Sequence, residues 1–308
     1  MNPPVDSPLR DASRVEHPEV SDASVTRAMG WLMGERTQSL PSDRALAQQL
    51  EKAVPWLEES LEISRAFLYH CAEFLGRNSG IEQFVTLSTG PYRPWPGRRA
   101  DLQPPCAAVP GSAVVHVRTL AGTGEAGPSC NHPQIYAGLD ERLSLLSSPA
   151  VEALDRRRPI GVLIDDPGPW TDIDELLSGL DRLRGWLPPG SAIALTHATA
   201  DLAPAEVRPR EDHAVRLRTE ATGRPYQPRT RAEIESLLAP WPLAGEGVVA
   251  TGGFFPDHAH SHLPEHHSSA CAALALHPLR ADLQAGPGVA GLAADATPEP
   301  ASKACGVR

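Results

Sequence analysis

The sequence lacks any hydrophobic run long enough to cross a membrane. No window of its 308 residues approaches about 18 uninterrupted apolar residues, the length that a spanning helix needs. The opening stretch, MNPPVDSPLRDASRVEHPEV, has neither the charged start nor the apolar segment of a signal peptide. We therefore expect a cytoplasmic protein without a membrane partner.

Cysteine and positive charge are also scarce. The five cysteines form no C-x-x-C pair and are too scattered for a zinc site or a disulfide framework, so we expect reduced thiols. Lys and Arg number 28 against 38 Asp and Glu, a formal net charge of −10. The arginine clusters at 156–158 and 224–231 have no aromatic platform beside them. The sequence therefore predicts no nucleic-acid partner.

Proline and glycine, in contrast, are abundant. The 32 prolines and 25 glycines exceed average usage, which indicates long loops or disordered tails. Residues 1–22 are polar without periodicity, and residues 258–308 contain few bulky apolar side chains. Such segments cannot offset the entropy lost on ordering, so we expect both to be disordered. Between them we expect a helical cap over 23–80 and a second domain over 81–257.

Hydrophobic spacing predicts helices and strands in alternation. Two amphipathic helices come first, one over 42–54 beginning at Ser42 and one over 56–75 capped by Gly76. Short apolar strands are predicted at 81–87, 113–117, 160–164, 192–195 and 248–255. Helices at 172–186 and 231–238 fall between strands, and Thr230 with Glu233 forms a capping box for the second. This order predicts an α/β fold with a doubly wound, mainly parallel sheet.

In such a sheet, ligands bind beyond the carboxyl ends of the strands. After the first predicted strand, residues 88–91 form either a short glycine loop that lets backbone approach a ligand or a plain turn. Asp165 and Asp166 follow a later strand, as a site or as a polar loop. His197 follows another strand, where it is a candidate catalytic base or a structural histidine bonded to backbone.

The segment IEQFVTLSTGP (81–91) resembles the glycine segment of an actinobacterial family of S-adenosylmethionine-dependent methyltransferases. Further similar segments occur in the family's order, so the resemblance covers roughly residues 23–255: PSDRALAQQL (41–50), ISRAFLYHCAEFL (63–75), RRPIGVLI (157–164), PPGSAIALTHATAD (188–201) and RTRAEIESLLAPWPLAGEGVV (229–249). The resemblance implies a Rossmann-like domain with an N-terminal helical cap over S-adenosylmethionine. It also implies methyl transfer to a small-molecule acceptor.

The resemblance places cofactor contacts at eight positions: Ser88, Thr89, Gly90, Pro91, Arg118, Thr119, Gly138 and Asp165. Four positions depart from the family pattern. Thr86 and Arg118 stand where the family has acids at the ends of the first and second strands, Ser88 replaces a loop glycine, and Gly138 replaces an acid on the adenine side. Arginine in place of a ribose-binding carboxylate removes a bidentate acceptor and adds positive charge. The alternative is therefore a non-catalytic descendant with weakened or lost cofactor binding, acting as a binding or regulatory module.

The segment HAHSHLPEHH (258–267) contains five of the twelve histidines. Its alternating His258, His260 and His262 offer ligands for Zn²⁺, Ni²⁺ or Cu²⁺. A segment interrupted by proline provides little support for a fixed metal geometry, so we predict no metal site. Metal handling by this segment stays open as a third function, and the sequence does not indicate the oligomeric state.

Overall fold

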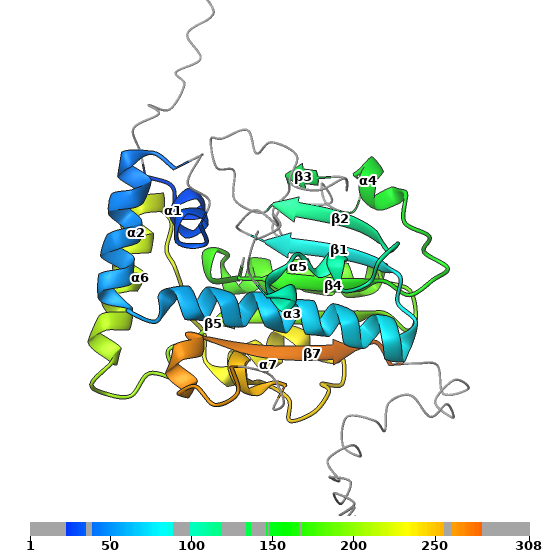
Figure 1. Cartoon of the computed structure of the whole chain (residues 1–308). Coiled ribbons are helices and arrows are strands. Elements are labelled where there is room, and N and C mark those ends of the chain that lie inside the picture. The colour runs from blue at the N-terminus through cyan, green and yellow to red at the C-terminus, as the bar shows by residue number, and fades with distance from the viewer. Residues whose placement is uncertain are drawn as a thin grey trace, which may run out of the picture.

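The computed structural model describes residues 23–34, 39–88, 99–118, 134–136, 146, 148–166, 168–255 and 260–278. These residues form one seven-stranded sheet in the order β3-β2-β1-β4-β5-β7-β6 (Figure 1). Its strands are β1 (Gln83–Ser88), β2 (Ala113–Arg118), β3 (Gln134–Tyr136), β4 (Gly161–Asp165), β5 (Ala192–Ala198), β6 (Val249–Ala250) and β7 (Ala270–Leu276). The first five strands are parallel, and β7 is antiparallel to both neighbours. The predicted α/β fold with a doubly wound, mainly parallel sheet is confirmed.

Helices cover both faces of this sheet (Figure 1). The helices are α1 (Val25–Leu32), α2 (Pro41–Ala53), α3 (Leu57–Ser79), α4 (Pro149–Glu152), α5 (Ile173–Trp186), α6 (Arg208–Thr222) and α7 (Arg231–Leu238). Leu68 and Leu75 of α3 pack with Phe84 of β1 on one face. Leu180 of α5 packs with Val85 of β1 on the other face, because successive strand residues point to opposite sides. No helix in these described ranges has the length and apolarity needed to span a bilayer.

A third apolar cluster lies at the carboxyl ends of the parallel strands. There α1, α2 and α6 gather, at the left of Figure 1, around Leu32, Leu50 and Ala214. The second half of α3 covers a sheet face, and α6 packs with α1 and α2, so the division into a cap over 23–80 and a second domain stays a prediction. Sequence periodicity did not reveal α6, because it is charged almost all round and buries little besides Ala214.

Several predicted element ends need correction. The helix predicted to end at Gly76 continues to Ser79 and ends at Gly80, whose φ of 62° favours glycine. Gly76 serves packing instead, since a Cβ there would lie 2.7 Å from Cγ2 of Val109. The strand predicted over 248–255 is only two residues long, because the chain turns into a 3-10 helix at Thr251–Gly253. The capping box of α7 is confirmed, with the Thr230 N–H donating to Oε2 of Glu233 at 2.8 Å.

The predicted disordered tail over 258–308 is wrong over the residues that form β7. This strand pairs with β5 along its whole length and with β6 at one end, and nearly all of it is buried. Its sequence, ACAALAL, has few bulky side chains, yet a strand inside a sheet gains ladder hydrogen bonds and buries both faces. Small residues therefore suffice there. Residues 1–22 and 279–308, also predicted to be disordered, lie outside the described residues.

Candidate functional site

Three of the predicted site residues form one row at the carboxyl edge of the sheet. Arg118 at the end of β2 pairs with Ser88 of β1, and Ser88 pairs in turn with Asp165 of β4. Asp165 then pairs with Thr196 of β5. The structure does not describe the remaining predicted cofactor contacts, which are Thr89, Gly90, Pro91, Thr119 and Gly138. It also does not describe the side chain of Arg118.

A cavity opens at this edge, between the sheet and the helical cap. Ser88 and Asp165 line it, together with Asp166 at the turn after β4 and Ala198 at the end of β5. Its apolar wall comes mainly from α1 and α3, with Val25, Met29, Met33, Leu57, Leu61 and Trp170. Other polar groups come from Ser60, Ser64, Arg65, Arg218, Tyr226, Ser268 and Ser269. The cavity therefore combines an apolar wall with polar groups that come from both the cap helices and the sheet edge.

Asp166 is the most perturbed acid in this cavity. Its backbone is left-handed with a φ of 49°, a conformation that aspartate tolerates better than most residues. Its Oδ2 accepts the hydroxyl of Tyr226 at 3.0 Å, and its Oδ1 accepts the N–H of Ala198 at 3.2 Å. Burial, and to a lesser degree the neighbouring Asp165, raise the pKa of Asp166 to about 7, although the charge of Arg218 opposes the shift.

Tyr226 is held firmly beside this acid. Its backbone N–H donates to Oγ1 of Thr219 at 3.1 Å, and its ring lies edge-on against Trp170 at a centroid distance of 4.6 Å. The guanidinium carbon of Arg218 lies 4.9 Å from the centre of the tyrosine ring. Burial and the adjacent Asp166 raise the pKa of Tyr226 well above its ordinary value, so its hydroxyl stays protonated and donates.

Asp165 faces the same cavity one residue earlier. It accepts the hydroxyl of Thr196 at 3.3 Å. Burial raises the pKa of Asp165, while the positive charge of Arg65 acts in the opposite direction. Two carboxylates and two guanidinium groups thus line one cavity, so the site suits a ligand that carries polar or charged groups on a compact apolar frame.

His197, the predicted catalytic residue, lies in β5 and is fully buried. Its Nδ1 lies 2.8 Å from the carbonyl oxygen of Ala198, and Nε2 has no hydrogen-bond partner within the described ranges. A Cβ on Gly168 would lie only 2.4 Å from the imidazole ring. Burial lowers the pKa of His197 to about 4, so the ring is neutral. His197 is not among the residues that line the cavity, and its surroundings fit the structural alternative better than a catalytic role.

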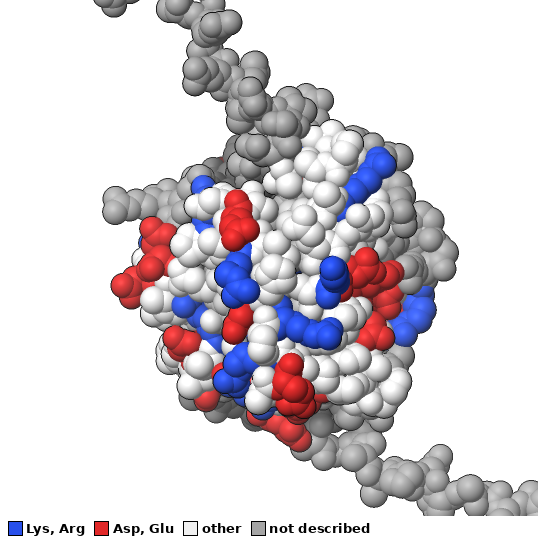
Figure 2. Space-filling view, turned by 90° about the vertical axis from the view of Figure 1, so that its left-hand side faces the viewer, with Lys and Arg blue, Asp and Glu red and all other residues white. Residues whose placement is uncertain are grey.

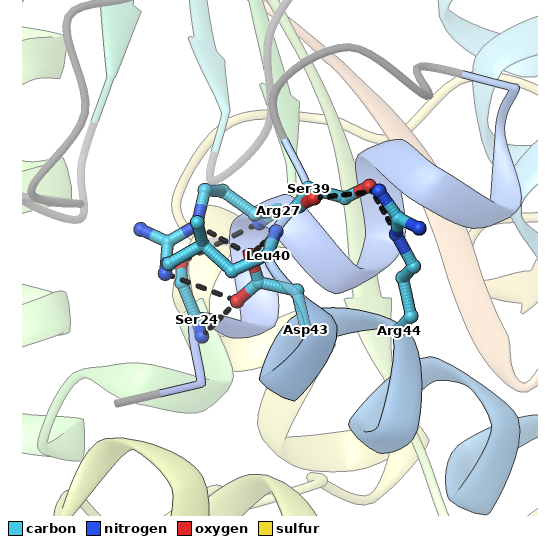
Figure 3. A network of polar contacts seen from close by, with 6 residues as sticks. All are labelled: Ser24, Arg27, Ser39, Leu40, Asp43 and Arg44. Atoms are coloured by element: carbon cyan, nitrogen blue, oxygen red, sulfur yellow. Dashed lines mark hydrogen bonds and ion pairs between the residues drawn. The ribbon is translucent and has the colours of Figure 1, made fainter. Parts of the chain in front are cut away.

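The cap over the cavity is fixed by one buried carboxylate, Asp43 of α2 (Figure 3). Its Oδ2 accepts Nε of Arg27 at 2.6 Å, and its Oδ1 accepts a terminal nitrogen of the same guanidinium at 3.0 Å. The backbone N–H groups of Ser24 and Leu40 donate to the same carboxylate, each at 2.7 Å. Asp43 therefore ties the start of α1 to the start of α2 and holds Val25 and Met29 against the cavity.

The position of the missing first-strand acid is filled by an internal contact. Oγ1 of Thr86 lies 2.6 Å from Nδ1 of His116 on β2, and both side chains are buried. For S-adenosylmethionine the edge therefore offers two kinds of surroundings. The carboxylates after β4 suit its ammonium and sulfonium charges, whereas Arg118 at the end of β2 offers no acceptor for its ribose hydroxyls. The chemistry fits the cofactor at the end of β4 and does not fit it at the end of β2.

Among the residues that the structure describes, the histidine-rich segment forms no metal site. Within the described part of the chain, no group of three or more His, Cys, Asp or Glu could hold a metal ion. His258 lies outside that part, while His260 and His262 lie within it. Figure 2 views the side on which α1, α2 and α6 lie, where positive and negative side chains are interspersed over the described surface.

Comparisons with known proteins agree with this architecture. A DUF574 family protein from Streptomyces avermitilis shares 24% identity with a TM-score of 0.69, covering 83% of this chain and 98% of that one. A candidate methyltransferase from Thermobifida fusca shares 23% identity with a TM-score of 0.69, covering 86% and 99%. No curated protein matches. The family model described as S-adenosyl methyltransferase matches residues 12–278, and the chain therefore belongs to the S-adenosyl methyltransferase family.

Proposed function

We propose that this protein transfers a methyl group from S-adenosylmethionine to a small-molecule acceptor bound in the cavity beneath α1. One observation carries the proposal. A cavity closed by an apolar helix is lined by Asp165 and Asp166 at the end of β4 and by Ser88 at the end of β1. This is the point of a doubly wound sheet at which ligands bind. When bound, S-adenosylmethionine supplies a methyl group activated by its sulfonium charge.

The residues of this chain would act by positioning and by excluding water. Met29, Met33 and Trp170 present apolar surface to the cavity, which keeps water from a reacting methyl group. The carboxylates of Asp165 and Asp166 complement positive charge beside it. A methyl transfer needs alignment more than it needs many catalytic side chains, so such a cavity is sufficient in kind.

A second candidate is a non-catalytic member of the family that uses the same cavity as a binding module. Arg118 supports it, because this residue occupies the end of β2 in register with Ser88, where a ribose diol requires a carboxylate. An arginine there also places a positive charge near a positively charged cofactor. The two candidates differ in one measurable property, the affinity for the cofactor.

Isothermal titration calorimetry of the full chain with S-adenosylhomocysteine separates the two candidates. Methyl transfer predicts a dissociation constant in the micromolar range and a rise in melting temperature with ligand. Flat heats at millimolar ligand would favour the binding module. If the site is merely eroded, Ser88→Gly combined with Arg118→Asp increases the affinity. Arg224→Asp, at an exposed arginine that does not line the cavity, is the matched charge control.

A further inference from the structure

We propose that the cavity binds an acceptor carrying both a hydroxyl group and a carboxylate, with Tyr226 and Asp166 taking the hydroxyl proton and Arg218 binding the carboxylate. This inference rests on the proposed function, because it names the acceptor class for the same cavity. It assigns chemistry to three side chains that come from two segments far apart in the sequence.

Tyr226 and Asp166 form the part of the site that binds the hydroxyl. The tyrosine hydroxyl donates to Oδ2 of Asp166 at 3.0 Å, so its proton is committed and its oxygen can only accept from a third group. Both residues line the cavity. The hydrogen bond from Gln227 N–H to the carbonyl of Pro169, at 2.7 Å, fixes the loop that carries the tyrosine. The geometry therefore presents a fixed acceptor to a donor within the cavity, and a hydroxyl group is such a donor.

Arg218 of α6 also lines the cavity. Its guanidinium packs over the Tyr226 ring. Within the described ranges this guanidinium makes no hydrogen bond or ion pair, although it lies near enough to Asp166 and Glu211 for its charge to oppose the rise in pKa that burial causes at both acids. A half-buried guanidinium offers five donors in a planar fork that matches a carboxylate. Arg216, two residues earlier on the same helix, is exposed instead. The arginine stacked on Tyr226 thus indicates that the ligand carries an anionic group. This group lies next to the hydroxyl that donates its hydrogen bond to the tyrosine oxygen.

Proton and electron transfers balance in this arrangement. The acceptor's hydroxyl proton passes to the oxygen of Tyr226, and the tyrosine proton passes to Oδ2 of Asp166. The acceptor oxygen then forms its bond to the methyl carbon, whose bond to sulfur breaks with the electron pair left on sulfur. Asp166 afterwards releases the proton to water, and its pKa of about 7 suits both steps near neutral pH.

The test uses three probes that differ by one group each. They are 3-hydroxybenzoate, phenol, which lacks the carboxylate, and benzoate, which lacks the hydroxyl. Calorimetry with the full chain, with and without S-adenosylhomocysteine, should show that wild type binds the first probe most tightly. Arg218→Gln should weaken the binding of both carboxylates about 10- to 100-fold and leave the binding of phenol unchanged.

Tyr226→Phe and Asp166→Asn should remove the preference for 3-hydroxybenzoate over benzoate, which a merely structural role would not do. Arg216→Gln is the matched control and should leave all three affinities unchanged. Melting temperatures of each variant identify any that fail to fold, and Tyr226→Phe keeps the ring in place for the comparison.

The outcomes separate this inference from the proposed function. If S-adenosylhomocysteine binds while none of the probes binds wild type at millimolar concentration, the acceptor assignment is overturned and methyl transfer stands. The assignment is also overturned if Arg218→Gln weakens all three probes equally. If the probes discriminate as expected while S-adenosylhomocysteine does not bind, the hydroxyl and carboxylate sites are supported and methyl transfer falls.

Discussion

The cap and the sheet edge each contain a carboxylate withdrawn from water, and the two have opposite surroundings. Asp43 in the cap faces the guanidinium of Arg27 and two backbone N–H groups (Figure 3). Asp166 at the sheet edge receives a neutral tyrosine hydroxyl and one backbone N–H. Four charge-assisted hydrogen bonds thus satisfy the first carboxylate, whereas two weaker ones leave the second poorly compensated.

The pKa values of the two acids follow from this difference. Burial alone would raise the pKa of Asp43, but hydrogen bonds from Arg27, Ser24 and Leu40 hold it below its usual value. For Asp166, burial outweighs its hydrogen bonds, and the pKa rises to about 7. Asp43 is therefore a permanent anion that serves the structure, and Asp166 is an acid able to exchange a proton in the physiological range.

We expect the largest loss of stability from the removal of Asp43, the carboxylate of the cap. Asp43→Ala removes the carboxylate that binds the mostly buried guanidinium of Arg27 and accepts the N–H groups of Ser24 and Leu40. We expect a loss of about 3–5 kcal/mol in the free energy of unfolding, the usual cost of removing one partner of a buried ion pair. Urea denaturation followed by circular dichroism measures it, with the slope against denaturant checking that unfolding remains two-state.

Arg44→Ala is the matched control for this prediction. Arg44 lies one residue away on α2 and is exposed, and among the described residues its guanidinium bonds only to the side chain and carbonyl of Ser39. Its loss should cost about 0.5 kcal/mol or less, as for most surface substitutions. Equal losses in the two variants would show that Asp43 is no anchor of the cap.

The sequence predicted the sheet edge better than the cap. Apolar runs such as Val162 to Ile164 are buried on both faces, so local composition indicates them directly. The register then brings Arg118, Ser88 and Asp165 together without further information, because parallel strands end at a common edge.

The cavity-lining side chains of Tyr226 and Arg218 could not be predicted in this way. Tyr226 lies in a loop and Arg218 in a charged helix, and neither has a local pattern that indicates its contact with Asp166. Only tertiary packing of α6 against α2 places them there. Asp166 itself stands in a recognisable DDPGPW turn, yet nothing in that turn separates an active acid from a polar loop.

The pH dependence of stability tests the raised pKa of Asp166. Asp166 in the folded protein binds its proton more tightly than in the unfolded chain, so it makes stability fall as pH rises from 3.8 toward about 7. Asp166→Asn should therefore gain stability relative to wild type across this interval, by about 2 kcal/mol after allowance for partial exposure, at about 1.4 kcal/mol for each pKa unit. Urea midpoints of both proteins, measured from pH 4 to 7.5, give this difference.

The difference between the two proteins is the informative quantity, because a second group acts in the opposite direction. Burial lowers the pKa of His197 to about 4, so its contribution to stability is lost as pH falls from 6.5 toward 4. In wild type the two effects partly cancel, and subtraction removes the histidine. A stability difference that does not change with pH would contradict the raised pKa of Asp166.

We expect the smallest loss of stability from a change at Gly168, which acts on Asp166 through His197 and Ala198. Gly168→Ala would place a Cβ 2.4 Å from Cδ2 and 2.6 Å from Nε2 of His197, whose ring is already held by the carbonyl of Ala198. Since Ala198 also donates its N–H to Asp166, movement there weakens that hydrogen bond. We expect a loss of about 1 kcal/mol in unfolding free energy, as for overpacking by one methyl group.

Gly185→Ala provides the control, because a Cβ at this position on α5 meets nothing within 4 Å. Alanine there should stabilise the helix by up to about 1 kcal/mol, since glycine is the poorer helix former. If Gly168→Ala proves as stable as Gly185→Ala, the imidazole has room to move and does not support the acid. If it is less stable and the pH-dependent gain from Asp166→Asn also shrinks in its background, the support of Asp166 runs from Gly168 through His197 and Ala198, independently of the cap that Asp43 holds.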